Sequence, residues 1–336
     1  MKGASAPFEP CSGVFGSSLF FLYYIHNVYI IKLDMASVGN PSIKKDPSTD
    51  GKMWVCKYSL DELSDNLKHI NVEQFNWSSL LYIDSRDYRY QIAKREGKEY
   101  VKYDPQWDEI TDDEYDELNK KIMMVVKYVL DNGADPNGWK KKRKGPDGSA
   151  DVVPLVKAAF YSKTPDIVNL LLEGGARADI PAQYYNEFKF PLASAIDRSR
   201  GRPFPPNIEI VKALVNKGRA DVNDRDFLSF DGGRGGITFL STPLHYALNA
   251  VPYGSSSKMH PINVDIIKFL LEKGANPYIE SMGIRAWPIH DKSPEIVQLF
   301  RDHLRELSEE FETSFSNNGD NKRQRHGVVS TLNIRF

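Results

Sequence analysis

The sequence predicts a mostly helical protein made of helix pairs that pack side by side. Two recurring segments lead to this prediction. One is a helix with apolar residues at i, i+3 and i+4 that a glycine closes, and it occurs four times. The other is a shorter helix that begins at a proline and lies upstream of three of these helices. An ordered pair that recurs along a chain is typical of repeat proteins, in which each unit packs against its neighbours.

The four glycine-closed helices end alike. The first reads VVKYVLDNGADPN and the last reads DIIKFLLEKGANPY. The residue just past a helix is often left-handed, a conformation that glycine adopts without steric cost. Each segment therefore predicts a helix followed by a short polar loop. The segments span 125–137, 166–179, 209–223 and 265–278, and their glycines are Gly133, Gly175, Gly218 and Gly274.

The proline-led helices share a second pattern. Proline fixes φ in the first helical turn, where its missing N–H is not needed, and a small residue four positions later lets two helices pack closely. Where Thr242 precedes the proline, its hydroxyl can also cap the helix. The segments are VPLVKAA (153–159), FPLASAI (190–196) and TPLHYAL (242–248), and WPIH (287–290) begins a further one.

TPLHYA (242–247) resembles the T-P-L-H-x-A signature of the ankyrin repeat family, and LLEKGANPY (270–278) resembles its second helix and loop. The resemblance covers residues 120–305. It implies an ankyrin-repeat solenoid of helix-turn-helix pairs with finger loops. The prolines Pro154, Pro191, Pro243 and Pro288 lie 37, 52 and 45 residues apart, whereas the family repeat has about 33 residues. Insertions are therefore expected.

The expected insertions are rich in glycine, proline and serine, which is typical of loops. Two of them, 198–207 and 250–263, separate the helices of one pair, and a third, 229–241, is expected as a flexible loop between repeats. The glycines in FDGGRGGI (230–237) do not form a phosphate-binding loop, because no G-K-[ST] helix start follows them.

Four regions are expected along the chain. Residues 1–52 form an apolar segment and a flexible extension, and residues 53–119 form an N-terminal cap. Within this small α+β cap, YRYQIAKREGKEYVKY (88–103) predicts a β-hairpin around a Glu-Gly turn. Ankyrin repeats follow at 120–307. After Leu307 the helical periodicity is lost, so 308–336 is expected to be a disordered tail.

The apolar run at 18–32 has three open interpretations. It is shorter than a spanning helix and carries His26 and Asn27 near its middle. Translation from Met35 would leave it out. Alternatively, residues 19–31 anchor the chain to a membrane or act as a signal, or the run packs as an apolar segment of the fold.

The composition argues against several kinds of chemistry. A formal charge of −1 does not favour nucleic-acid binding. Two cysteines, Cys11 and Cys56, provide neither a disulfide framework nor a cysteine-based zinc site, and the seven histidines show no metal-ligand spacing. We therefore expect no metal, no cofactor and no catalysis. His245 and His290 occupy the histidine of the family motif, where the resemblance implies a structural hydrogen bond between neighbouring loops.

The expected function is that of a monomeric scaffold or adaptor that binds a partner protein through a concave face. The alternatives are a membrane-tethered ankyrin protein and an enzyme with its active site in the N-terminal 120 residues. In the resembling family the first helix of each pair and the loop tips line the concave face. Counting three and six residues from each proline, and adding nearby aromatic residues, gives Trp139, Lys157, Phe160, Tyr161, Ser194, Asp197, Tyr246 and Asn249. Phe160 could instead belong to the core.

A basic loop follows the first clear repeat, at Lys140, Lys141, Lys142, Arg143 and Lys144. Five consecutive cations are expected in water. Three interpretations remain open: a solvated loop, a nuclear import signal, and a contact to phosphate or an acidic partner. The expected location is the cytoplasm, with the nucleus as the alternative.

Overall fold

A computed structural model describes the helices and strands of the chain. The described residues are 51–81, 88, 92–94, 97, 111–138, 153–184, 187–197, 204–230, 237–248, 260–281, 284–285 and 294–317. The chain divides into two units, Met1–Asp46 and Pro47–Phe336, and every described residue lies in the second. The apolar run at 18–32, Trp139, the basic loop 140–144, Asn249 and His290 fall outside the described residues.

The N-terminal part of this unit is helical. Ser59 and Glu62 cap α3 reciprocally, each side chain bonding the other's backbone N–H. The predicted β-hairpin at 88–103 is wrong where the structure describes it, because Tyr88 and 92–94 are helical. The elements are α2 (Gly51–Lys57), α3 (Leu60–Asn66), the 3₁₀ turns η2 (Leu67–His69) and η3 (Val72–Gln74), and α4 (Trp77–Leu81).

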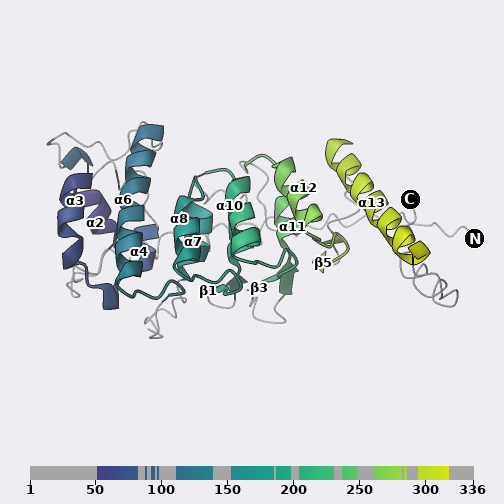
Figure 1. The fold of residues 1–336 in the computed structure, drawn as a ribbon, viewed down its shortest axis with the longest axis horizontal. Coiled ribbons are helices and arrows are strands. Elements are labelled where there is room, and N and C mark those ends of the chain that lie inside the picture. The colour runs from purple at the N-terminus through teal and green to yellow at the C-terminus, as the bar shows by residue number, and fades with distance from the viewer. Residues whose placement is uncertain are drawn as a thin grey trace, which may run out of the picture. The chain divides into compact units, whose positions relative to one another are not determined.

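Two layers of helices follow, as Figure 1 shows. In the first layer, α4 contacts α7, α7 contacts α9, and α9 contacts α11. In the second layer, α6 contacts α8, and α10 contacts α12. First-layer helices are α7 (Pro154–Tyr161), α9 (Pro191–Ile196) and α11 (Pro243–Ala247); second-layer helices are α6 (Asp112–Asp131), α8 (Asp166–Glu173), α10 (Ile208–Lys212) and α12 (Val264–Glu272). The predicted helix pairs are confirmed.

Small and branched apolar side chains form the core between the layers. Ala159 of α7 and Ala195 of α9 are fully buried, which lets the first-layer helices approach closely. Leu171 of α8 and Leu214, which follows α10, are also fully buried. A buried leucine contributes roughly 1.5–3 kcal/mol relative to an exposed one, so this continuous core stabilises the stack.

Left-handed glycines close three of the four predicted helices. Gly133, Gly175 and Gly274 have φ values of 90°, 93° and 85°. The fourth helix differs: Gly218 has φ of −76°, and Arg219 takes the left-handed conformation with φ of 55°. The prediction is therefore wrong for Gly218.

A single extra residue explains this difference. In the repeat that ends at Gly274, the N–H of Ala275 bonds the carbonyl of Leu270, whereas the N–H of Ala220 bonds the carbonyl of Leu214. The second interval is one residue longer. A π-helical turn, η5 (Ala213–Lys217), accommodates the extra residue and moves the left-handed position from Gly218 to Arg219.

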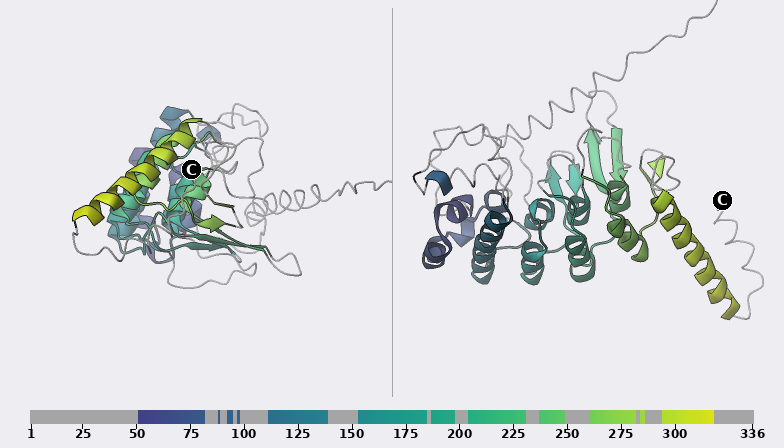
Figure 2. Two further views of the ribbon diagram at one scale, coloured as in Figure 1. Left: turned by 90° about the vertical axis from the view of Figure 1, so that its right-hand side faces the viewer. Right: turned by 90° about the horizontal axis from the view of Figure 1, so that it is seen from above.

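Short antiparallel strands connect the repeats. The strands β1 (Ala182–Tyr184), β2 (Glu187–Lys189), β3 (Asp226–Phe230) and β4 (Ile237–Ser241) form one sheet in that order, and β5 (Glu280–Ser281) pairs with β6 (Ile284–Arg285). They lie on one side of the helices (Figure 2). The flexible loop expected at 229–241 is therefore wrong over 229–230 and 237–241, where aromatic and β-branched residues such as Phe230, Ile237 and Thr238 favour strands.

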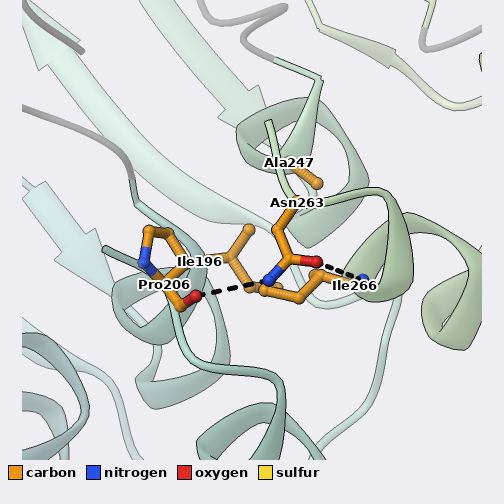
Figure 3. A pocket seen from close by; sticks show the side chains of 5 residues that line it. All are labelled: Ile196, Pro206, Ala247, Asn263 and Ile266. Carbon is orange, nitrogen blue, oxygen red and sulfur yellow. Dashed lines mark hydrogen bonds between the residues drawn. The ribbon is translucent and has the colours of Figure 1, made fainter. Parts of the chain in front are cut away.

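The two insertions within helix pairs lie where the proline spacing places them. The α9 helix ends at Ile196 and α10 begins at Ile208, and α11 ends at Ala247 before α12 begins at Val264. The side-chain oxygen of Asn263 accepts from the N–H groups of Asp265 and Ile266 and so caps α12. Its side-chain amide group donates to the backbone carbonyl of Pro206 (Figure 3). The hollow around this contact has no space for a water molecule, so it is a packed seam between repeats.

The C-terminal helix α13 (Pro294–Asn317) continues past Leu307. The disordered tail expected at 308–336 is therefore wrong for residues 308–317. Ile296, Phe300 and Leu304 are buried, and α13 packs on α12. No proline or glycine interrupts the sequence between Leu307 and Asn317, so nothing in it stops the helix.

Candidate protein-binding surface

Residues from three first-layer helices, α7, α9 and α11, meet Lys189 of the β1–β2 hairpin. Lys189 is the last residue of β2 and lies two residues before the proline of α9. Its ammonium group lies among side chains of α7, α9 and α11. We call the group formed by Lys157, Phe160, Tyr161, Lys189, Asp197 and Tyr246 the cation–aromatic cluster.

Each lysine of the cluster lies over an aromatic ring. The Nζ of Lys189 is 5.5 Å from the ring centre of Phe160 and 5.4 Å from that of Tyr246. The Nζ of Lys157 is 5.6 Å from the ring centre of Tyr161. Such contacts contribute about 0.5–1 kcal/mol at exposed sites and more when water is excluded. The rings of Phe160 and Tyr161 also meet edge to face, 4.9 Å apart.

An ion pair holds Lys189 in place. Its ammonium donates to the carboxylate of Asp197, and the two side chains are only 22% and 13% exposed. A half-buried pair of this kind is screened by salt less than a surface pair. The hairpin β1–β2 is therefore tied to the first-layer helices by charge as well as by packing.

A second carboxylate, Asp226, lies beneath the cluster at the start of β3. It is fully buried and accepts a hydrogen bond of 2.8 Å from the backbone N–H of Phe190. Burial raises the pKa of this carboxyl to about 7, although Lys189, the Phe190 N–H and the Tyr246 hydroxyl each lower it. Asp226 thus changes protonation state near neutral pH.

The residues expected on the concave face fall into three groups: those in the cluster, those that are buried, and those outside the described residues. It brings Lys157, Phe160, Tyr161, Asp197 and Tyr246 together in the cluster. Ser194 is only 1% exposed, so the expectation that it contacts a partner is wrong: α9 turns this position into the core. Tyr246 is 6% exposed and supports Lys189 from below. Trp139, Asn249 and the basic loop 140–144 are outside the described residues.

The sequence pattern did not predict Lys189 of the cluster or Asp226 beneath it. Lys189 and Asp226 both belong to strands, whereas the counting rule considered the first helices and the aromatic residues near them. The alternation in EFKF (187–190) carries a signal, since every second side chain of a strand points to the same face. Asp226 directly precedes the apolar residues of β3, a position where a buried carboxylate is unusual.

The described residues contain no group of three His, Cys, Asp or Glu residues that could hold a metal ion. His245 is fully buried, and its Nδ1 lies 2.8 Å from the hydroxyl of Thr242 within the same repeat. This bond caps α11, and the bond between neighbouring loops that the resemblance implied stays a prediction. A groove of about 260 Å³ between α10 and α12 is lined mainly by charged residues of the second layer.

Comparison with known families agrees with this geometry. The family model of the ankyrin repeat matches residues 240–281, which run from the end of β4 through α11 and α12 to β5. The chain contains an ankyrin repeat. The matched repeat contributes Tyr246 to the cation–aromatic cluster. Searches among curated proteins and among solved structures gave no significant match.

Ankyrin repeats are modules for protein–protein interaction. The helix pairs α7–α8 and α9–α10 precede the matched repeat and share its proline-led first helix. Among the helices that the structure describes, none is both long enough and apolar enough to cross a membrane.

Proposed function

We propose that this chain is a non-catalytic scaffold or adaptor whose ankyrin repeats form a solenoid and bind a partner protein through the cation–aromatic cluster. The observation behind the proposal is the convergence of Lys157, Phe160, Tyr161 and Lys189 on the first-layer side, next to the hairpins. A repeat stack supplies a continuous surface for a partner without any pocket.

The chemistry of the cluster suits protein recognition. Aromatic residues and long cationic side chains contribute strongly to binding when a partner covers them. Here Lys157, Phe160 and Tyr161 are partly exposed, and their mutual contacts hold them in place before a partner arrives. Because side chains that are already ordered lose little entropy on binding, preorganisation raises affinity.

The test compares two matched double variants of the full chain in affinity capture from native lysate. Lys157→Glu/Tyr161→Ala changes the proposed surface. Lys268→Glu/Tyr278→Ala makes the same changes on the second-layer helix α12 and in the loop that follows it, where Lys268 and Tyr278 are exposed. Circular dichroism and the melting temperature first establish that both variants fold.

A partner that the parent and the control variant retain, and that Lys157→Glu/Tyr161→Ala loses by at least about tenfold (about 1.4 kcal/mol), supports the proposal. Equal retention by both variants would show that the cluster is not the binding surface.

A further inference from the structure

Asp226 occupies an unusual position between two hairpins. One carboxylate oxygen accepts the N–H of Phe190, which follows β2, while Asp226 itself begins β3. The other oxygen, Oδ2, is buried and has no regular hydrogen-bond partner in the described part of the chain. The Asp226 side chain therefore links the β1–β2 hairpin to the β3–β4 hairpin of the next repeat.

The contact between these two fingers is otherwise small. Strand β2 pairs with β3 through one register pair, Phe188 with Phe227, whereas β3 and β4 share five. A single backbone pair contributes little by itself. The hydrogen bond from Phe190 to Asp226 adds a second link between β2 and the start of β3.

The charges around Asp226 make an ionised carboxylate costly at this position. From β2, Lys189 attracts it; from the end of α9, Asp197 repels it and already shares the Lys189 ammonium; from α11, Tyr246 directs its hydroxyl toward it. Across the strand pair, Ser241 of β4 is neutral and bonds Ser281. One ammonium therefore faces two carboxylates, of which Asp226 is fully buried, and burial of an excess negative charge is unfavourable.

We propose that Asp226 is a proton-dependent latch between the β1–β2 hairpin and the β3–β4 hairpin, closed when its carboxyl is protonated and loosened when it ionises. Protonation leaves Oδ1 free to accept from Phe190 and gives Oδ2 a proton to donate. Ionisation adds an uncompensated charge beneath the Lys189–Asp197 pair and weakens the contact of β2 with β3. The latch lies under the cation–aromatic cluster but does not depend on partner binding.

The direction of the pH dependence follows from linkage. A carboxyl whose pKa rises from 3.8 to about 7 on closing binds protons more tightly in the closed state. Closure is therefore fully favoured at acid pH, weakens as the pH rises toward about 7, and stays constant above it. Between pH 6 and pH 8 the closing equilibrium is expected to fall about tenfold.

The experiment measures hydrogen exchange of the full-length chain at pH 6 and pH 8, corrected for the intrinsic dependence of exchange on pH. The amides that report on the latch are those of Phe188, Phe190 and Phe227. Asp226→Asn keeps the acceptor for Phe190 and cannot ionise. Asp131→Asn removes the same charge from the exposed end of α6 and serves as the control.

Protection of these amides is expected to fall about tenfold from pH 6 to pH 8 in the parent and in Asp131→Asn, and to stay unchanged in Asp226→Asn. Protection that is independent of pH in the parent, or the same pH dependence in Asp226→Asn, overturns the proposal. Should Asp226→Asn fail to fold, carbon NMR of the Asp226 carboxyl in the parent decides: a pKa near 7 supports the latch, and a value near 4 overturns it.

Discussion

Arg219 carries the least favourable backbone conformation among the described non-glycine residues. Its φ of 55° lies in the left-handed region, where a Cβ atom makes close contacts that glycine avoids. The adjacent Gly218 is needed for a different reason, since an added Cβ would lie 2.6 Å from the carbonyl oxygen of Leu214. The two residues therefore cannot exchange roles.

Arg219→Gly is expected to raise stability by about 0.5–1 kcal/mol, because it relieves the left-handed strain at modest entropic cost. Thermal unfolding by circular dichroism measures the change. The paired variant Gly218→Ala should lower the melting temperature, because its Cβ meets backbone. A stability gain in Arg219→Gly together with a stability loss in Gly218→Ala supports the π-turn geometry of η5. A change of stability in the same direction for both variants would contradict it.

Asp226→Asn is expected to change how global stability depends on pH. In the parent, the Asp226 carboxyl binds its proton more tightly when folded, so its contribution to stability declines as the pH rises from about 4 to about 7. Asparagine has no such dependence. The melting temperatures of the parent and of Asp226→Asn are compared at pH 5, 6, 7 and 8. Toward pH 8 the two values should converge, or the variant should become the more stable protein. Parallel curves for parent and variant would contradict the buried carboxyl.

At the scale of single elements, a buried leucine of a second-layer helix can be compared with an exposed leucine of α13. Leu171 of α8 is fully buried, while Leu307 of α13 is 47% exposed. Leu171→Ala is expected to cost about 2–5 kcal/mol, and Leu307→Ala to change stability by less than about 0.5 kcal/mol. Urea unfolding monitored by tryptophan fluorescence compares them. Similar losses for both would show that α8 is not packed as described.

Asparagine side chains join the loops of neighbouring repeats. Asn223 accepts from the N–H of Asn276 at 2.7 Å and donates to the carbonyl of Gly274 at 3.0 Å. Asn223→Ala is expected to cost about 1–2 kcal/mol in chemical denaturation, because two backbone groups lose their partner. Asn137 makes the equivalent bonds to Arg177 and Gly175, so Asn137→Ala should have a similar cost. A negligible loss in both variants would indicate that water replaces these bonds freely.

Much of the element order could be predicted from sequence because proline and glycine determine helix ends through their own backbone preferences. Proline at the first turn of α7, α9 and α11 and a left-handed glycine after α6, α8 and α12 define helix ends whatever lies around them. The strands β3 and β4 were predicted as a loop because the segment between them is rich in glycine, a residue typical of loops. The π-turn depends on a one-residue insertion, which periodicity alone does not reveal.

The candidate surface was less predictable than the helices. Counting from each proline selected Lys157, Phe160, Asp197 and Tyr246, whose side chains lie in one region, because helix geometry fixes these offsets. The same rule included Ser194, which is buried. It left out Lys189, since a strand brings that residue to the site and the counting rule did not extend to strands.

At the scale of the whole molecule, the central claim is that a partner protein covers the cation–aromatic cluster. Site-specific photo-cross-linking tests this most directly. A photoreactive phenylalanine analogue replaces Tyr161 in one full-length variant and the exposed Tyr278, in the loop after α12, in another. Each is irradiated in native lysate, and adducts are identified by mass spectrometry.

The account predicts one recurring protein adduct at position 161 and its absence at position 278. Adducts at position 278 alone, or the same set at both positions, would contradict binding through the cluster.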